Sequence, residues 1–417
     1  MPRVLRPDQL HPGMTLYTAI RRGATMLLPG NWELRRDDIA RLQKRCPEVR
    51  VQVRDPDLDD IVPFDEASDE QAYVEAAMTR ATACASEVMK IANDSSPNRS
   101  NYTSLERAVS EVIAFIVMNP VGRVLPKVPF QPDSYLADHM SNVFFLAMQI
   151  ASKNRHFVVS ERMRQTHARD LSYVLAHSLL PLGIATLYMD MGMLELGEYE
   201  RTNAPLSDRD WKRIRGHVEH TATKLPPWIP PAARVVIRHH HENADASGYP
   251  DKLPLERQHV FCRIARVCDS YDAAITPRRF RQPKSAIRAL WEMTYGPLRS
   301  QYDPTLVRAL DEIVEPFPLG TQLRLDDGRV ATVCGRSRDP FTPLAAITHD
   351  EAGRLRPTYE VRQAVLLTGE DGVPRIETCD GEDVSYIYDR PPELPPAPEA
   401  ASPKTSVHTG GSRPQAA

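Results

Sequence analysis

The chain has 417 residues, 41% of them hydrophobic and 26% charged, which is the composition of an ordinary globular protein with two or three domains. Its net charge of −3 argues against binding to DNA or to a membrane surface through bulk charge. The six cysteines form no C-x-x-C pair, the chain opens on a polar segment, and the longest apolar run, Val112–Met118, is too short to cross a bilayer. We therefore expect a soluble cytoplasmic protein with reduced thiols.

Residues 1–65 predict a small α+β module with a regulatory role. Short strands are expected at Met14–Tyr17, Met26–Leu28 and Val51–Val53, and a helix with acidic residues in its first turn is expected to begin at Asp37. Residues 66–100 then carry a modest apolar stripe of helical period, and we interpret them as a connecting helix.

Residues 101–316 show helical periodicity and no strand pattern, which predicts an all-α domain. A capping box at Thr103 is expected to open one helix, and further helices are expected at 134–153, at 161–189 and from Ser207 onward. An antiparallel bundle can bring residues that are distant in the sequence together in its core.

Residues 317–390 predict a small β module, with a hairpin over 320–333 and further strands at 364–367 and 384–388. Residues 391–417 are dominated by proline, alanine, serine and glycine, which predicts a disordered tail. The predicted fold class is therefore mainly α, with a helical bundle between a small N-terminal α+β module and a small C-terminal β module.

Three consecutive histidines, His239 to His241, form the most unusual stretch of the chain. They follow an apolar helical approach and precede a polar loop that ends in Gly-Tyr-Pro, a turn signal. Imidazoles at the end of a helix, beside a tight loop, are well placed to bind a metal ion at the mouth of a cleft.

Histidines and aspartates from separate helices complete a candidate metal site, and such a mixture of ligands suits iron, manganese or zinc. The candidates are His139, Asp190, His217, His240, His241 and Asp269. Taken singly, a histidine such as His139 is more often a packed or surface residue. Asp272 shares a helical face with Asp269, and the alternative to a functional role for it is a hydrogen bond to a ligand residue.

The order of these residues resembles the HD-GYP family, a branch of the HD metal-dependent phosphohydrolases. Its most specific parts are the His-His-Glu-x-x-Asp-x-x-Gly-Tyr-Pro of residues 240–250 and the segment 263–281, which holds Asp-x-x-Asp-Ala. The resemblance implies an HD-type helical bundle, a divalent metal and cyclic di-GMP as ligand, because many members hydrolyse this bacterial second messenger. Some members also carry flanking modules of the kind expected here.

The chain departs from the family pattern on one side of the site. Met189 stands where the His-Asp pair has its histidine, and Met193 stands where a lysine is expected. Tyr135 replaces a common glutamate, Asn243 replaces the usual arginine after His-His-Glu, and Ala246 replaces a glycine. The resemblance thus predicts a degenerate active site.

In the two-metal arrangement that the resemblance implies, all ligands of one cation are present, namely Asp190, His217, His240 and His241. The other cation takes His139, the missing histidine, Asp190 and Asp269, with Asp190 bridging both metals as the catalytic carboxylate. A thioether is a poor substitute for imidazole with iron or manganese. We therefore expect one bound metal, with the second bound weakly or not at all.

Hydrolysis should suffer more than ligand binding. Two cations stabilise the attacking and leaving oxygens in such sites, and one lost electrostatic donor typically costs about 3 kcal/mol, roughly a hundredfold in rate. The basic residues around the Asp269 helix could contact phosphates, and Tyr249 could stack on guanine. The candidate substrate contacts are Tyr249, Asp272, Arg278, Arg279 and Arg281, with Arg263, Arg266 and Lys284 nearby.

Three functions remain open at this stage. The favoured one is a signalling protein that binds cyclic di-GMP with weak or no phosphodiesterase activity, and the first alternative is an active metal-dependent phosphodiesterase. The second alternative is a scaffold that docks a protein such as a diguanylate cyclase without nucleotide. A homodimer is compatible with each of them. A further histidine, His177 or His220, could fill the ligand vacancy.

Overall fold

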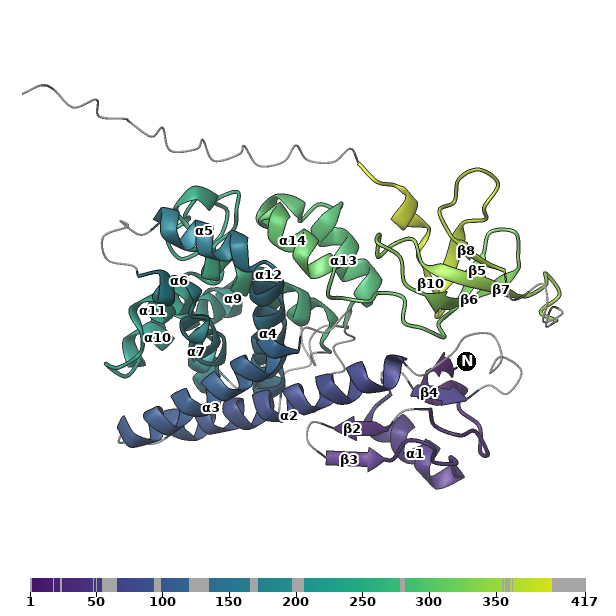
Figure 1. Cartoon of the computed structure of the whole chain (residues 1–417), viewed down its shortest axis with the longest axis horizontal. Helices are drawn as coiled ribbons and strands as arrows, with labels where there is room; N and C mark the ends of the chain where they lie inside the picture. The colour runs from purple at the N-terminus through teal and green to yellow at the C-terminus, as the bar shows by residue number, and fades with distance from the viewer. Residues whose placement is uncertain are drawn as a thin grey trace, which may run out of the picture.

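The structure, a computed structural model, describes residues 2–17, 19–22, 25–47, 49, 51–54, 66–93, 99–119, 135–165, 172–196, 206–277, 282–354, 356, 361 and 363–391. Figure 1 shows a helical body, with the N-terminal and C-terminal modules lying toward the same end of the longest axis. The expected fold class is confirmed: the chain is mainly α, with helices between two small modules that contain strands. In the described part of the chain, no helix combines the length and hydropathy needed to cross a bilayer.

In its described residues, the N-terminal module contains two strand pairs, one α-helix and the 3-10 turn η1 (Pro7–Gln9) around a small core of its own. Its elements are β1 (Pro2–Leu5), β2 (Ile20–Arg22), β3 (Thr25–Leu28), α1 (Arg36–Arg45) and β4 (Val51–Arg54). Strand β1 pairs with β4 and β2 pairs with β3, both antiparallel. The strand expected at Met14–Tyr17 is reduced to isolated bridges at Thr15 and Leu16. The core includes Leu16, Leu34 and Val51.

The helical body is built around α4 (Tyr135–Lys153), which contacts α2, α3, α7 and α12. The other helices are α2 (Glu66–Asn93), α3 (Arg99–Met118), α5 (Arg155–Gln165), α6 (Tyr173–His177), α7 (Leu180–Tyr188), α9 (Asp208–Arg215), α10 (His217–Lys224), α11 (Pro231–His239), α12 (Val260–Ile275), α13 (Ala286–Thr294) and α14 (Pro304–Asp311). Short 3-10 turns are η1 (Pro7–Gln9), η3 (Met191–Leu196), η4 (Leu255–Arg257) and η5 (Arg299–Gln301). Helix α2, expected as a connection, shares the core of α3 and α4.

Two helix boundaries differ from the sequence prediction. The single helix expected at 161–189 is divided into α5, α6 and α7, because Ser172 caps α6 by accepting from the backbone N–H of Leu175, and Pro181 lies in the first turn of α7. Helix α3 begins at Arg99, and the Thr103 hydroxyl donates to the Arg99 carbonyl within the helix instead of capping it.

The C-terminal module is a six-stranded antiparallel sheet in the order β10-β9-β5-β6-β7-β8. The strands are β5 (Gln322–Leu325), β6 (Val330–Gly335), β7 (Leu344–His349), β8 (Ala364–Leu366), β9 (Ile376–Cys379) and β10 (Glu382–Asp383). The strand expected at 384–388 is the 3-10 helix η6 (Ser385–Tyr388), because the Asp383 carboxylate accepts from the backbone and hydroxyl of Ser385 and turns the chain. The tail expected beyond residue 391 lies outside the described residues.

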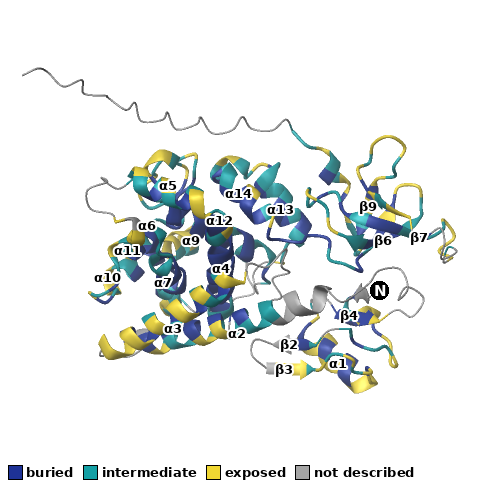
Figure 2. Ribbon diagram, in the orientation of Figure 1, coloured by how far each residue is buried: buried dark blue, intermediate teal, exposed yellow. Residues whose placement is uncertain are grey.

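One hydrophobic core runs from the helices into this sheet, as the buried inner faces in Figure 2 show. It includes Phe144 on α4, Tyr271 on α12 and Leu323 on β5, each buried. Burial of such large side chains stabilises the body by roughly 1.5–3 kcal/mol each. The ends of α4, α7, α11 and α12 are thereby held in fixed relation.

Candidate metal centre

Five segments of the helical body each contribute one or two of the candidate ligands. His139 lies in the second turn of α4, Asp190 directly follows the cap of α7, and His217 is the first residue of α10. His240 and His241 directly follow α11, and Asp269 lies on α12. Most of these positions are helix ends, where the chain can turn a side chain across the bundle while the helix packs in the core.

The structure brings these six residues into two adjacent clusters that share Asp190. In each cluster the ligand atoms lie within 4.8 Å of one another, which is close enough to hold a metal ion. The larger cluster contains Asp190, His217, His240 and His241, and the smaller contains His139, Asp190 and Asp269. These are the residues that the sequence resemblance assigned to the two cations, without the histidine that Met189 replaces.

Backbone hydrogen bonds fix the tautomer of two histidines in the larger cluster. His217 donates from Nδ1 to the Ile214 carbonyl at 2.6 Å, and His240 donates from Nδ1 to the Ile237 carbonyl at 2.9 Å. In each neutral ring Nε2 is therefore the acceptor atom. These two Nε2 atoms lie 3.4 Å apart, and Nε2 of His217 lies 3.3 Å from Oδ1 of Asp190. Backbone carbonyls that fix the tautomer of a histidine are typical of metal ligands.

The smaller cluster is organised by a carboxylate behind its histidine. Oδ2 of Asp272 lies 2.6 Å from Nδ1 of His139, while Nε2 of His139 lies 3.1 Å from Oδ1 of Asp269 and 3.5 Å from Oδ2 of Asp190. Asn142 donates to the other oxygen of Asp272 at 2.8 Å. The carboxylate of Asp272 therefore orients His139 from the side away from the shared aspartate.

Asp190 provides a direct test of whether a cation fits here. Its carboxylate is buried, and Oδ2 makes no well-formed hydrogen bond to any of the described residues. An ionised oxygen left in this state is costly, and a cation removes the cost. The Nε2 atoms of His217 and His240 lie 3.3 and 3.7 Å from Oδ1, and His241 belongs to the same cluster, so this geometry fits a divalent metal ion.

The charges of the site reinforce one another. Burial would raise the pKa of the Asp190 carboxyl, but the neighbouring imidazoles of His139, His217 and His240 hold it well below its usual value. Burial alone would lower the pKa of His139, but Tyr135 and the surrounding carboxylates raise it well above the usual value. Burial and then the nearby His240 lower the pKa of His241. Asp190 is thus anionic and His241 neutral, as metal ligands must be.

Met189, Met193 and Tyr135 stand where the family pattern has a histidine, a lysine and a glutamate. The Met189 side chain is fully buried in the hydrophobic core, and Met193 packs against that core from η3. The ring of Tyr135 stacks on the His139 imidazole, with centroids 5.5 Å apart. Neither methionine presents the imidazole or ammonium that the family pattern has at its position.

Neither of the two spare histidines belongs to a cluster. His220 pairs with Glu195 on the surface of η3, and His177 lies on α6 beside a separate pocket. The vacancy suggested by Met189 is therefore not filled by a histidine among the described residues.

The loop after the histidines is held against the clusters by Glu242 and Gly248. The buried Glu242 carboxylate accepts from the backbone N–H groups of Asp251 and Leu253, at 2.6 and 2.9 Å. A Cβ at Gly248 would lie 2.3 Å from the backbone nitrogen of Asn243, so only glycine fits this close approach. The loop places the Tyr249 ring on the His241 imidazole, with centroids 4.7 Å apart.

The basic residues expected to bind an anion differ in their surroundings: two pair with carboxylates outside the clusters, and Arg266 lies near Asp269. Arg263 is buried and pairs with Asp303 and Glu161, so it serves the core of the domain. Lys284 pairs with Glu292. Arg266 remains near the site, 3.9 Å from Asp269, and donates to Asn243 at 2.8 Å. The candidates Arg278, Arg279 and Arg281 lie outside the described residues.

Two supporting residues were missed in the sequence. Asn142 lies three residues after His139 on α4, and this spacing alone could have indicated a shared helical face. Thr221 accepts from the Gly192 N–H at 2.8 Å, and its hydroxyl donates to the His217 carbonyl at 2.8 Å and lies 3.2 Å from the Met189 carbonyl. It thereby ties the chain around Asp190 to α10, and no sequence signal pointed to it.

Comparison with known proteins gives similarities in both sequence and structure. A family described as HD domain matches residues 146–306, which include all candidate ligands except His139. The chain is 32% identical over 195 residues to the protein named cyclic di-GMP phosphodiesterase PA4108 of Pseudomonas aeruginosa. That match covers 46% of this chain and 45% of the relative, so the chain spans less than half of the relative's length.

The structural likeness is to the solved structure titled Bd1817, a HDG"Y"P protein from Bdellovibrio bacteriovorus. Its TM-score is 0.42 at 14% identity, covering 74% of this chain and 98% of that one. A likeness at this level adds no argument to the sequence matches.

Proposed function

We propose that this chain, part of which matches the HD domain family, is an HD-GYP-type cytoplasmic signalling protein that binds cyclic di-GMP beside a degenerate metal site and hydrolyses it weakly or not at all. The relative from Pseudomonas aeruginosa is named for the hydrolysis of this dinucleotide, which motivates the choice of ligand.

The observation that carries the proposal is the unequal composition of the two clusters around Asp190. The larger cluster offers four protein ligands and fits a divalent cation such as iron, manganese or zinc. The smaller offers three, one of them shared, while the Met189 side chain beside it is buried among apolar groups. One cation should therefore bind firmly, and the second should bind weakly or not at all.

The side chains present suit nucleotide binding better than bond cleavage. When bound, a divalent cation supplies Lewis-acid activation of water and of a phosphoryl oxygen. Asp190 holds charge between the clusters, and Asp272 keeps His139 in orientation. The Tyr249 ring, which stacks on the His241 imidazole, is the expected contact for a guanine base. Arg266 offers a cation for a phosphate, as Arg278, Arg279 and Arg281 do in the family-based expectation.

The decisive experiment counts metal and follows the nucleotide in one preparation. The full chain is purified, its metal is quantified, and cyclic di-GMP binding and cleavage are measured by calorimetry and chromatography. We expect about one metal per chain and saturable binding without turnover comparable to a phosphodiesterase. The variant Asp190→Ala should lose the metal. The exposed Asp37→Asn, in the N-terminal module, serves as the control.

Two other outcomes correspond to the alternatives. Cleavage to the linear dinucleotide or GMP that disappears in Asp190→Ala would identify an active phosphodiesterase. Absence of both metal and nucleotide binding would leave a scaffold that docks a protein such as a diguanylate cyclase, as a monomer or a homodimer.

A further inference from the structure

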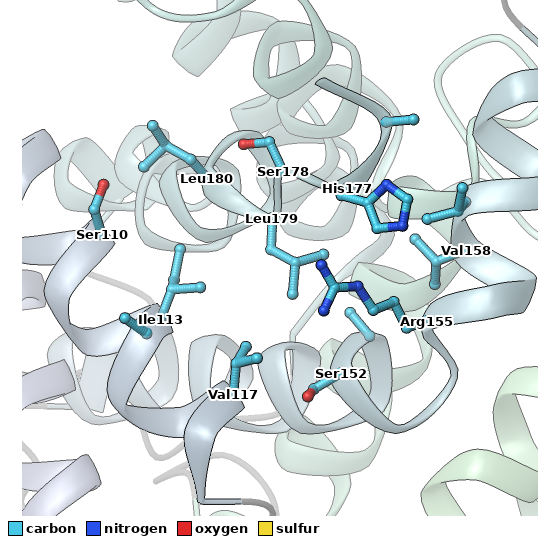
Figure 3. A pocket seen from close by; sticks show the side chains of 14 residues that line it. Ser110, Ile113, Val117, Ser152, Arg155, Val158, His177, Ser178, Leu179 and Leu180 are labelled. Carbon is cyan, nitrogen blue, oxygen red and sulfur yellow. The ribbon is translucent and has the colours of Figure 1, made fainter. Parts of the chain in front are cut away.

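A pocket of about 290 Å³ lies in the helical body between α3, α4, α5, α6 and the start of α7. Its wall is mainly aliphatic and includes Ile113, Val117, Val158, Leu179 and Leu180. Figure 3 shows these side chains arranged around an open space. None of the candidate metal ligands lines this pocket.

Two helices, α4 and α7, each have one end at the pocket and the other end at the metal clusters. Ser152, at its wall, lies thirteen residues after His139 on α4, which is about 20 Å along the helix axis. Leu180 opens α7 at the pocket, and Asp190 follows the other end of the same helix. A ligand here would therefore be distinct from a nucleotide at the metal site.

The charge of the pocket is one-sided. Arg155 extends its guanidinium toward the centre of the space, beside Leu179 (Figure 3). Within the described part of the chain, Arg155 makes no hydrogen bond or ion pair, unlike Arg162 and Arg164 on the same helix. The described residues that line the pocket include no aspartate or glutamate, while His177 adds an imidazole and Ser152 and Ser178 add hydroxyl groups. An unpaired cation beside an apolar wall is complementary to an anion with an apolar body.

The size and shape of the wall narrow the ligand class. At about 30 Å³ for each water-sized group, 290 Å³ holds roughly ten non-hydrogen atoms. No phenylalanine, tyrosine or tryptophan lines the space, so apart from the His177 imidazole the described residues around it offer a ligand mainly aliphatic surface. We propose that this pocket is a binding site for a small aliphatic carboxylate of medium chain length, with its head group on Arg155 and its chain among Ile113, Val158 and Leu179. This inference does not depend on the proposed function of the metal centre.

Titration calorimetry of the full chain with octanoate tests the proposal. Saturable binding of one octanoate per chain is expected. Arg155→Gln, an exposed position, should weaken it at least tenfold, because the carboxylate loses its charge partner. Ala114→Trp, at the exposed mouth of the pocket, should weaken it by occupying the space. The matched control is Arg209→Gln, an exposed arginine on α9 outside the pocket, which should bind octanoate as the unchanged chain does.

Two further ligands separate the contribution of charge to octanoate binding from the contribution of hydrophobic contact. Octylamine should not bind, since its ammonium would face Arg155, and inorganic phosphate alone should bind far more weakly than octanoate. Equal affinity of Arg155→Gln and Arg209→Gln for octanoate would overturn the proposal, as would binding of octylamine with the affinity of octanoate. Tighter binding of phosphate than of octanoate would likewise overturn it in favour of a plain anion site.

Discussion

Oδ2 of Asp272 lies 2.6 Å from Nδ1 of His139, and this contact directs the other ring nitrogen of His139 toward Asp190 and Asp269. The pair joins α4 to α12 through two buried side chains. Asn142 and Thr276 complete the environment of Asp272, donating to its two oxygens at 2.8 and 3.4 Å. Asp272, which is not itself a proposed metal ligand, thus determines the orientation of the proposed ligand His139.

Replacing Asp272 by asparagine should loosen the smaller cluster while leaving the larger one intact. Loss of the carboxylate behind a ligating histidine typically lowers metal affinity by roughly 10–100-fold. Metal titration should therefore show a weaker second binding event with an unchanged first event. If both events weaken equally, the substitution has disturbed the fold and not the orientation of His139. Asp37→Asn on α1 is the control.

Three single substitutions should distinguish the two clusters. His139→Ala removes a residue of the smaller cluster alone, His217→Ala one of the larger alone, and Asp190→Ala one of both. We expect the tightly bound metal to persist in the first variant and to be lost in the other two, as measured by metal content after dialysis. Retention of the tight metal in His217→Ala would contradict the assignment of four ligands to one cation.

Restoring the family's expected groups should restore a second metal. Met189 is fully buried, so Met189→His on its own places a polar ring in an apolar environment and should destabilise the chain unless a metal binds it. The double variant Met189→His with Met193→Lys should gain metal, raise cleavage of cyclic di-GMP and recover thermal stability when manganese is added. Unchanged metal content and activity would contradict the alignment of Met189 with the missing histidine.

Metal binding should strengthen as pH rises. Burial opposes a charged His139, but Tyr135 and the surrounding carboxylates raise its pKa well above 6.5. The protonated ring therefore stabilises the metal-free chain fully below about pH 6.5, and this contribution is lost as pH rises through the raised pKa. A cation must displace that proton. Manganese should increase the melting temperature more at about pH 8 than at about pH 6, and His139→Gln should reduce the difference.

Two arginines three residues apart on α12 should have opposite phenotypes. Arg263 is buried between Asp303 and Glu161, and Glu161 also pairs with Arg164. Arg263→Met therefore leaves the buried Asp303 carboxylate uncompensated and should cost about 3–5 kcal/mol of unfolding free energy. Arg266 lies near Asp269 and is more exposed, so Arg266→Met should change stability less and weaken nucleotide binding more. Denaturant unfolding and calorimetry measure the two effects. The reverse pattern would assign the anion contact to Arg263.

The amino-acid sequence alone determined the fold class and the set of candidate ligands. Helical periodicity with no strand pattern over 101–316 predicts a bundle, and the run at 240–250 carries a family signature specific enough to align His139, Asp190, His217 and Asp269 with it. Local signals of this kind depend on residue spacing within one element or on a motif, and both can be recognised in the amino-acid sequence without a structure. The same local reasoning was wrong for 161–189 and 384–388, where a capping serine and an aspartate turn ended or redirected the chain.

Only the tertiary structure decided which residues share an environment. Several contacts join segments far apart in the chain. They include the pairing of His139 with Asp272, the pairing of Arg263 with Asp303, the contacts of Thr221 with Met189 and Gly192, and the pocket around Arg155. They depend on how helices cross and on where each side chain is buried. The physical reason is that packing in a shared core sets these distances, whereas periodicity specifies only the face of a helix and not its partner.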